Sequence, residues 1–315
     1  MWGALAALAI VNFPLMIRAA DRTGGVQERR PDMKQGRRAA HQFHLFSQQT
    51  RKAMEITGQT KIMFVLAHPA GSVRASDVLN RFFQEKGCNV AVSPLDVAPE
   101  DLGPVLAAIR RMRNVVGFGV TMPNKIAVVP HLDHLTEEAR QIGAINFVRR
   151  NADGTLLGDN LDGKGFLSGM LKNGIHVAGK RVLQIGAGGA GRATAFALAR
   201  GGAREVFIVN RDESRATALA MELKAPDGTV VGRSGAMPAG AFDVIINATS
   251  LGMKPEDPLP LDPSLIGSEC AVCDIVVNPP VTRLMEAAIA RGAVAIGGKH
   301  MLDEQMELVK ELVGI

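Results

Sequence analysis

One glycine-rich stretch restricts the fold of this chain more than any other feature of its sequence. It spans residues 181–195 and reads Arg-Val-Leu-Gln-Ile-Gly-Ala-Gly-Gly-Ala-Gly-Arg-Ala-Thr-Ala. An apolar strand pattern runs directly into Gly186, Gly188 and Gly191, and an alanine-rich helical pattern follows. This strand–turn–helix context is typical of a dinucleotide-binding fingerprint, whose glycines allow a tight turn, backbone approach to the pyrophosphate and close helix packing. A cofactor site is the favoured interpretation, and close packing without a cofactor is the alternative.

The patterns before this stretch predict an α/β domain. Strand-like patterns at 61–67, 89–94 and 115–121 alternate with helix-like patterns at 75–86 and 101–112. A helix pattern at 135–142 precedes a strand pair at 144–149 and 156–158, which flanks the turn Asn151-Ala-Asp-Gly. A helix pattern at 166–172 then connects to the glycine-rich stretch. Such alternation predicts a mostly parallel sheet covered by helices.

A second alternation begins at Arg181. Further strands are expected at 205–210, 243–247, 271–275 and 293–296, and helices at 189–200, 213–224 and 282–291. We therefore expect two α/β domains with a cleft between them. We expect residues 58–162 to form the first domain, which is left to act as the substrate-binding catalytic domain, and residues 163–299 to form a Rossmann NAD(P)-binding domain. An amphipathic helix at 301–312, within a closing segment 300–315, is expected to return to the first domain.

Residues 1–53 differ in character from the rest of the chain. An apolar run at 2–17 is followed by polar, basic sequence with little periodicity. A signal or anchor and a targeting extension are two interpretations, although the run has no basic region before it. We favour a third, a natural start near Met54, and expect residues 1–57 to be a poorly ordered extension.

The positive charge of the chain is concentrated in that extension. The net charge is +5 overall, whereas residues 1–53 alone carry nine Arg or Lys and three acidic residues, so the remainder carries −1. A body so close to neutral gives no argument for a polyanionic partner. We expect a small-molecule substrate, with no nucleic-acid partner and no membrane partner.

The cysteines and histidines predict no metal site. Cys270 and Cys273 form a C-x-x-C pattern within an apolar strand pattern, and no second ligand pair is near them. A buried strand is therefore favoured over zinc or redox chemistry, and a reducing cytoplasm fits best. His131 and His134 belong to no recognised metal motif and are interpreted as solvated. His68 ends the first strand near the expected cleft, where a structural role is favoured over substrate contact.

Two ionisable residues are candidates for proton transfer. Hydride transfer to or from a nicotinamide needs a group that takes or gives the alcohol proton as the hydride moves. Lys125 follows a strand and its turn, and Asp162 lies where the chain crosses between the expected domains. A partly desolvated lysine can act as a base near neutral pH, and a neighbouring carboxylate orients it and shares its proton. On spacing alone, ordinary surface-loop roles are favoured for both.

Six motifs occur together and in order along the chain. They are Gly-Val-Thr-Met-Pro-Asn-Lys (119–125), Ile-Gly-Ala-Ile-Asn (142–146), Gly-Asp-Asn-Leu-Asp-Gly (158–163), Gly-Ala-Gly-Gly-Ala-Gly-Arg-Ala (186–193), Asn-Ala-Thr-Ser-Leu-Gly-Met (247–253) and Met-Leu-Asp-Glu-Gln (301–305). Over about residues 61–315 the chain thus resembles the shikimate dehydrogenases, also called shikimate/quinate dehydrogenases. The resemblance implies reversible reduction of 3-dehydroshikimate to shikimate by a nicotinamide cofactor, in aromatic amino acid biosynthesis.

The resemblance also implies roles for single residues. The catalytic pair becomes Lys125 and Asp162. The contacts to substrate hydroxyl or carboxylate groups become Thr121, Asn146 and Gln305. The residues that line the nicotinamide side become Asn247, Thr249 and Met253.

Several substrate contacts usual in that family are missing. Val73 and Ala75 stand where the family's Ser-x-Ser loop hydrogen-bonds the substrate carboxylate. Gly119, Leu161 and Val277 stand where Asn, Thr and Tyr are usual. A site that loses such bonds loses orders of magnitude in activity on its substrate. The natural substrate is therefore left open.

Arg74 lies between the two replaced serine positions. A guanidinium can bind both oxygens of a carboxylate, so Arg74 is a candidate clamp for an acidic substrate. A solvated arginine at the start of a helix is an equally good interpretation. If Arg74 is the clamp, Arg74→Ala raises the KM for an acidic substrate.

The end of the second nucleotide-domain strand bears on the choice of cofactor. An acid there binds the ribose 2′-hydroxyl of NAD, whereas an arginine accommodates the 2′-phosphate of NADP. Asn210, Arg211 and Arg215 resemble the NADP-type members, although Asp212 replaces their usual Thr or Ser. We expect NADP, with NAD as the alternative. The other expected cofactor contacts are Gly186, Gly188, Gly189, Ala190, Gly191, Val277 and Gly298.

Three hypotheses follow. The leading one is a cytoplasmic NADP-dependent dehydrogenase acting on shikimate, 3-dehydroshikimate or a related cyclic hydroxy acid, with Lys125 and Asp162 as the proton-transfer pair. The second is an NAD-dependent dehydrogenase of quinate or another alcohol. The third is a non-catalytic dinucleotide-binding regulator, which the retained pair argues against. The sequence does not decide between a monomer and a homodimer.

Overall fold

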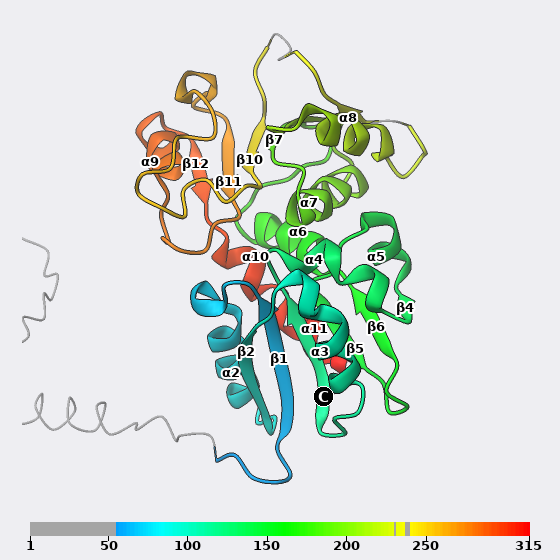
Figure 1. Cartoon of the computed structure of the whole chain (residues 1–315). Coiled ribbons are helices and arrows are strands. Elements are labelled where there is room, and N and C mark those ends of the chain that lie inside the picture. Colours follow the sequence, from blue (N-terminus) through cyan, green and yellow to red (C-terminus); the bar gives the residue numbers. More distant parts are fainter. Residues whose placement is uncertain (1–54, 230, 237–239) are drawn as a thin grey trace, which may run out of the picture. The chain divides into compact units, whose positions relative to one another are not determined.

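The computed structural model describes residues 55–229, 231–236 and 240–315 (Figure 1). The natural start expected near Met54 lies outside them, as does nearly all of the extension expected at 1–57. The described residues hold two six-stranded sheets covered by helices, which confirms the α/β class. No helix in this part of the chain is long and apolar enough to cross a membrane.

The first sheet has the strand order β2-β1-β3-β5-β6-β4. Its strands are β1 (Lys61–Ala67), β2 (Val90–Asp96), β3 (Val115–Val120), β4 (His134–Leu135), β5 (Phe147–Arg150) and β6 (Leu156–Asp159). β1 runs parallel to β2 and β3, whereas β5 runs antiparallel to β3 and β6. The β5–β6 hairpin confirms a strand pair around the Asn151-Ala-Asp-Gly turn, although its first strand begins at Phe147 instead of residue 144.

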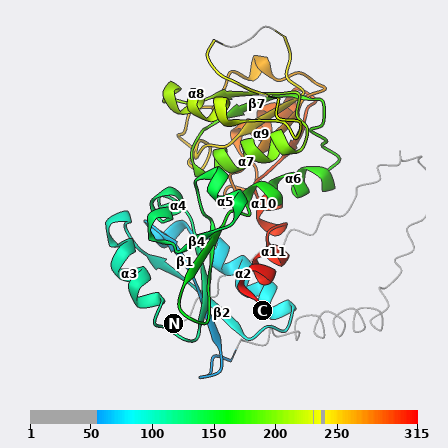
Figure 2. The same ribbon diagram turned by 90° about the vertical axis from the view of Figure 1, so that its right-hand side faces the viewer.

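Side chains of β1 alternate between the two faces of this sheet, as the period of two along a strand requires. Met63 and Val65 share one apolar core with α2 (Ala75–Glu85) and with α11 (Met306–Val313). Leu66 belongs to the core on the other face, which α3 (Leu102–Ile109) covers (Figure 2). Because both faces are covered, the strand reads as a nearly continuous apolar run.

The second sheet is parallel throughout and has the order β12-β11-β10-β7-β8-β9. Its strands are β7 (Arg181–Ile185), β8 (Glu205–Val209), β9 (Gly232–Arg233), β10 (Val244–Asn247), β11 (Ala271–Asp274) and β12 (Val294–Ile296). Counted from β7, this is the 3-2-1-4-5-6 order of dinucleotide-binding sheets. One face packs on α6 (Asp162–Lys172), α7 (Gly189–Arg200) and α8 (Glu213–Glu222), and the other on α9 (Arg283–Ala290).

Several expected helix boundaries are wrong. The helices expected at 101–112 and 213–224 end early, at Ile109 and Glu222. The helix expected at 135–142 is α5 (Glu137–Ile142), because Leu135 pairs with Gly158 in the sheet and the Thr136 side chain caps the helix. The helix expected at 166–172 begins four residues earlier, at Asp162. Cys270 directly precedes β11 and Cys273 lies within it, and both are buried. This confirms the strand interpretation of the C-x-x-C pattern.

The single helix expected at 301–312 is also wrong. The structure has two helices, α10 (Lys299–Asp303) and α11, which are separated at Glu304 and Gln305. Gln305 N bonds to Leu302 O, three residues back instead of four, so the helical ladder is interrupted. The interruption leaves the Gln305 side chain buried, 3% exposed.

Candidate active site

Lys125 lies in a short helix that follows the carboxyl end of β3. This helix, α4 (Asn124–Ala127), begins directly after the Thr121-Met122-Pro123 turn. The buried Asn124 side chain donates from Nδ2 to Val97 O at 2.8 Å. Lys125 O accepts a bond from Ile145 N at 2.8 Å. These two bonds hold α4 against the neighbouring segments and thereby fix the position of Lys125.

Asp162 is the first residue of α6, and its carboxylate contacts Lys125 directly. Lys125 Nζ and Asp162 Oδ2 form an ion pair whose side chains are only 15% and 6% exposed. The N-terminus of a helix stabilises a carboxylate. Asp162 N donates to Asn160 Oδ1 at 3.1 Å, which orients this first turn. The structure thus brings the two predicted catalytic residues together.

Two amide side chains join this pair. Asn146 Nδ2 donates to Asp162 Oδ1 at 2.9 Å and to Gln305 Oε1 at 2.8 Å. Gln305 Nε2 lies 3.3 Å from Asp162 Oδ1. Both carboxylate oxygens are therefore bound by donors, so Asp162 orients the lysine. Lys125, Asn146, Asp162 and Gln305 are called the polar cluster below, and Lys125 Nζ is its member with hydrogens left for a ligand.

The close approach of the segment that carries Gln305 depends on a glycine in α6. A Cβ at Gly165 would lie 2.5 Å from Met301 O and 2.6 Å from Gln305 Cγ. A Cβ at Gly163 would lie 2.7 Å from Ala193 O in α7. α6 therefore packs tightly against both α10 and α7, and holds Asp162 between Gln305 and the glycine-rich turn.

The glycine-rich turn lies directly beside the polar cluster. A Cβ at Gly189 would lie 3.2 Å from Lys125 Cβ. Gly186 has a φ of +112°, which favours glycine, and a Cβ at Gly191 would lie 2.4 Å from Gly186 O. At Gly188 a Cβ would meet nothing within 4 Å. Since the first N–H groups of α7 also lack intrahelical partners, the turn fits the pyrophosphate of a dinucleotide.

Gln184 supports this turn from beneath. The side chain is fully buried in β7, and its Nε2 donates to Gly186 O at 2.9 Å and to Gly191 O at 2.8 Å. Its Oε1 accepts from Thr194 Oγ1 at 2.8 Å. One amide thus ties together both ends of the turn and the first turns of α7. The available signal was a polar residue inside an otherwise apolar strand pattern.

The residues expected near the adenosine ribose follow the carboxyl end of β8. Asn210 Oδ1 accepts from Ala187 N at 3.1 Å, which joins it to the glycine-rich turn. Asp212 caps α8 by accepting from Ser214, and those bonds lower its pKa from the ordinary value. Arg215 Nε lies 3.2 Å from Asp212 Oδ2. The charge of Asp212 is thus engaged locally, while Arg211 is exposed at the strand tip.

The residues expected on the nicotinamide side follow β10. Asn247 Oδ1 accepts from Thr249 Oγ1 at 2.6 Å, so these two side chains bond to each other. Asn247 Nδ2 donates to Asp274 Oδ1 at 3.0 Å, inside the protein. Burial raises the pKa of Asp274, which is 2% exposed. Met253 ends this loop with its side chain 38% exposed and open to a ligand.

Two further expected cofactor contacts follow the next strands of the same sheet. Val277 lies three residues after β11 and is half-buried. Gly298 precedes α10, and a Cβ there would lie 2.1 Å from Ile275 O. The expected cofactor residues thus all follow the carboxyl ends of β7, β8, β10, β11 and β12. This edge is where parallel α/β sheets bind their ligands.

The loop that carries the missing serine positions is largely apolar. Val73 packs into the core shared with α2, and Ala75 is the first residue of α2. Arg74 is exposed and makes no side-chain hydrogen bond or ion pair with the described residues. Thr121 N bonds to Leu66 O, which places Thr121 at the carboxyl edge of the sheet. The structure does not connect Arg74 to the polar cluster, and its clamp role stays a prediction.

Asp96 tethers the start of that loop. Its Oδ1 lies 2.7 Å from His68 Nδ1, and its Oδ2 accepts from Ala70 N at 3.1 Å. The bonds to His68 and Ala70 lower the pKa of Asp96 from the ordinary value. Asp96 is not among the expected site residues, because the strand predicted at 89–94 stops before it, whereas β2 extends to Asp96. Its signal was its place at the carboxyl end of β2, in register with Ala67.

The arrangement is suited to proton transfer beside a bound dinucleotide. An ammonium group is held by a nearly buried carboxylate, next to a turn that fits a pyrophosphate. Two amides beside that pair hold its carboxylate in place. No group of three or more potential metal-ligating side chains occurs in the part of the chain that the structure describes.

Comparisons with known proteins agree with this geometry. The family model described as "Shikimate dehydrogenase substrate binding domain" matches residues 65–148, and "Shikimate / quinate 5-dehydrogenase" matches residues 170–253. A shikimate dehydrogenase (NADP(+)) of Rubrobacter xylanophilus is 41% identical over 251 residues, covering 78% of this chain and 88% of that protein.

Solved structures give the same result. A shikimate dehydrogenase in complex with NADP+ aligns with a TM-score of 0.76 at 33% identity, covering 83% of this chain and 92% of that one. The ligand-free 5-ketofructose reductase of Gluconobacter sp. strain CHM43 aligns with a TM-score of 0.72 at 34% identity, covering 81% and 93%. Chains similar to this one therefore include enzymes named for an acidic substrate and for a ketose.

Proposed function

The chain belongs to the shikimate dehydrogenase family, and on that premise we propose that it interconverts 3-dehydroshikimate and shikimate with NADP(H). The observation that carries the proposal is the Lys125–Asp162 pair beside Gly189 of the dinucleotide turn. A merely structural ion pair has no need of that position. When bound against the glycine-rich turn, NADPH would supply the hydride for ketone reduction and NADP+ would accept it in alcohol oxidation.

The chemistry of the chain's own residues is proton transfer and orientation. In the direction of ketone reduction, the ammonium form of Lys125 donates a proton to the carbonyl oxygen while the carbonyl carbon receives a hydride. In the direction of alcohol oxidation, the neutral amine of Lys125 takes the hydroxyl proton and passes it to solvent. Asp162 holds Nζ in place in both directions. Asn146 and Gln305 hold Asp162 through their amide nitrogens, whose hydrogens are then all engaged, so their oxygens are left to accept from neighbouring substrate hydroxyls.

A steady-state assay of reduced-cofactor absorbance tests this proposal. Shikimate and quinate are each tested with NADP and with NAD, and Lys125→Ala is the control. We expect turnover of shikimate with NADP and its loss in the variant. Tight cofactor binding without turnover of any cyclic hydroxy acid contradicts the proposal and favours a regulator.

A neutral ketose or polyol is a second candidate substrate. Val73 and Ala75 are apolar, and they stand at the positions where the resemblance to the family implies serine donors for a substrate carboxylate. The similar 5-ketofructose reductase shows that a protein of this fold is named for a neutral ketose. The same assay with 5-ketofructose and NADPH decides between the two. A kcat/KM higher for the ketose than for 3-dehydroshikimate replaces the first proposal with the second.

We also propose that the enzyme acts in the cytoplasm on small molecules and without nucleic acid. The near-neutral body supports the absence of a nucleic-acid partner, since residues 54–315 carry a net charge of only −1. Size-exclusion chromatography with light scattering distinguishes the monomer from the homodimer, and a mass of twice 33.4 kDa identifies the dimer.

A further inference from the structure

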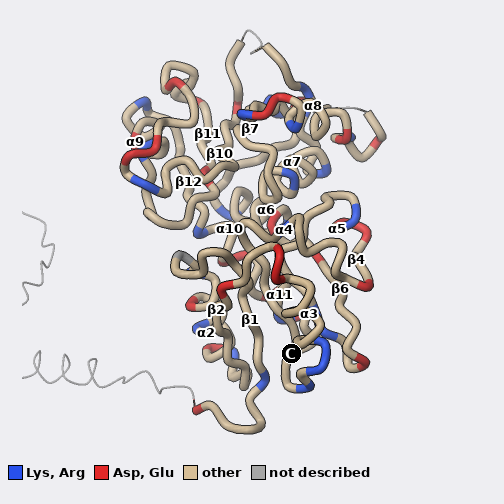
Figure 3. Tube along the Cα trace, in the orientation of Figure 1, with Lys and Arg blue, Asp and Glu red and all other residues tan. Residues whose placement is uncertain are grey.

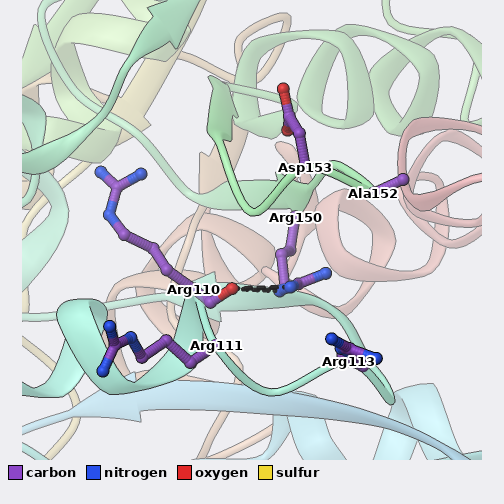
Figure 4. A pocket seen from close by; sticks show the side chains of 6 residues that line it. All are labelled: Arg110, Arg111, Arg113, Arg150, Ala152 and Asp153. Atoms are coloured by element: carbon purple, nitrogen blue, oxygen red, sulfur yellow. Dashed lines mark hydrogen bonds between the residues drawn. The ribbon is translucent and has the colours of Figure 1, made fainter.

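A hollow lined by arginines lies at the end of the first sheet away from the polar cluster. It has a volume of about 570 Å³ and is lined by Arg110, Arg111, Arg113, Arg150, Ala152 and Asp153 (Figure 4). The first three precede β3, whereas Thr121 and Lys125 follow it. Because a strand rises about 3.3 Å per residue, the six residues of β3 separate the two places by roughly 20 Å. The hollow is therefore distinct from the candidate active site.

Arg150 is a rigid part of this hollow. Its Nε donates to Ile109 O at 3.2 Å and to Arg110 O at 3.1 Å, and its Nη2 donates to Arg110 O at 2.6 Å. Its Nη1 donates to Asn151 O at 3.1 Å. These acceptors are backbone carbonyls, mostly at the C-terminal end of α3, and they carry no formal charge. The guanidinium is thus held in one place with its positive charge not neutralised by a carboxylate.

The other lining charges leave the hollow positive. Arg110 is paired with Asp133, whose pKa this arginine lowers, so that pair is neutral. Asp153 accepts from Thr155 N at 2.9 Å and from Thr155 Oγ1 at 2.7 Å, and it bonds to none of the arginines. Arg111 and Arg113 are exposed and make no ion pair with any described residue. Arg111, Arg113 and Arg150 therefore line the hollow without a carboxylate partner, and its one remaining acid, Asp153, already bonds to Thr155.

We propose that this hollow binds a small free anion that carries at least two phosphate groups. Arginine presents a fork of donors that fits phosphate oxygens, and a preorganised arginine loses less entropy on binding. In Figure 4, Arg111 lies on one side of the Arg150 guanidinium and Arg113 on the other, which suits a ligand with two anionic groups. The volume lies within the roughly 300–1,000 Å³ of small-molecule sites.

The position of this charge on the molecule supports the proposal. Residues 54–315 carry a net charge of −1, so the run at 110–113 and the neighbouring Arg149 and Arg150 are a local excess on a nearly neutral body. Figure 3 shows this basic run beside α3 and β5. A local positive field raises the concentration of small anions near it.

Calorimetric titration with inorganic tripolyphosphate tests the proposal. The full chain is first saturated with NADP+, so that the dinucleotide turn is occupied and cannot take the probe. The test variant is Arg111→Ser/Arg113→Ser, which removes two exposed arginines and leaves the Arg150 anchor. The matched control is Arg81→Ser/Arg140→Ser, which removes the same charge from exposed positions on α2 and α5.

We expect the wild type and the control to bind tripolyphosphate equally, and the test variant to bind at least about tenfold more weakly. Orthophosphate is expected to bind more weakly than tripolyphosphate. No binding to the wild type overturns the proposal, and so does equal weakening in both double variants. Binding to phosphatidylserine vesicles but not to free tripolyphosphate also overturns it, because the ligand is then a membrane surface.

Discussion

Gln305 Oε1 accepts a hydrogen bond of 2.8 Å from Asn146 Nδ2, although the two residues lie 159 positions apart. The bond brings the C-terminal segment, after the whole second sheet, back to the first domain. Asn146 Nδ2 also bonds to Asp162 Oδ1, the carboxylate that orients Lys125. The candidate active site is therefore complete only when the C-terminal segment that carries Gln305 is in place.

The catalytic assignment predicts the effect of removing the lysine amine. Lys125→Ala should lower kcat by at least about 100-fold, since general acid–base groups contribute that much or more. The dissociation constant of NADPH, measured by fluorescence titration, should stay within about threefold of wild type. Lys125→Arg is the control for charge: it keeps a cation and should remain at least about tenfold impaired. A kcat for Lys125→Ala close to wild type removes the assignment.

The contact of Gln305 with Asp162 predicts a second effect. Gln305→Glu places a second carboxylate about where Gln305 Nε2 now lies, 3.3 Å from Asp162 Oδ1. Two carboxylates so close repel each other, and both then compete for the ammonium group of Lys125 and for the single Nδ2 group of Asn146. We expect the KM of the substrate to rise about tenfold and the pH–rate profile to shift, with the KM of NADP unchanged. Gln305→Met is the uncharged control, which should raise the KM without moving the pH profile.

Gln184 is predicted to prepare the dinucleotide turn for its ligand. Gln184→Leu removes the buried hydrogen-bond partner of Gly186 O, Gly191 O and the Thr194 hydroxyl. Each buried polar group left unpaired lowers the free energy of unfolding by about 1–3 kcal/mol. The KM of NADP should rise about tenfold while the KM of the substrate stays constant. Val206→Ala, in the neighbouring strand, is the matched control for lost stability. If both variants change the KM of NADP equally, Gln184 serves only the core.

Asp274 predicts a dependence of stability on pH. Because burial raises the pKa of its carboxyl group in the folded protein, the folded state binds that proton more tightly than the unfolded state. The stabilisation is complete below the unfolded value of about 3.9 and is lost as the pH rises through the folded value. Asp274→Asn keeps the Oδ1 acceptor and cannot become charged. The free energy of unfolding of this variant, relative to wild type, should therefore increase as the pH rises through the folded pKa of Asp274. Urea denaturation at several pH values measures the difference, and an advantage that shrinks as the pH rises contradicts the sign.

The cysteines predict a pattern of chemical reactivity. Burial raises the pKa of Cys270 to about 11 and raises that of Cys273 further. At pH 8 only about one Cys270 thiol in a thousand is ionised, so neither residue should react quickly. Cys88 is half-buried and should be the one thiol that a thiol reagent labels in the native protein. Cys88→Ser should abolish fast labelling, and full denaturation should expose two thiols in that variant.

Most of the secondary structure was predictable, because it follows from contacts between near neighbours. The β1 strand and the glycine-rich turn with its helix have the predicted bounds, since alternating apolar residues and glycine spacing are local signals. The bounds of α5 and the closing helices were not predictable. In both places a partner far away in the sequence binds a residue that the local pattern assigns to a helix. Leu135 pairs with Gly158 in the sheet, and the Gln305 side chain bonds to Asn146.

The candidate site divides in the same way. Lys125, Asp162 and the glycines of the turn are visible in the sequence, because a motif places each of them beside a strand end. The tertiary structure alone decides which of these groups meet. It brings Lys125 to Asp162, and it brings Asn146 and Gln305 to the same carboxylate. It also places Asp96 and Gln184 beneath the two loops that they support. The physical reason is that a hydrogen bond depends on positions within a few tenths of an ångström. The packing of α6 against α7 and α10, through glycines that leave no room for a side chain, sets the position of Asp162, and the hydrogen bonds of α4 set that of Lys125.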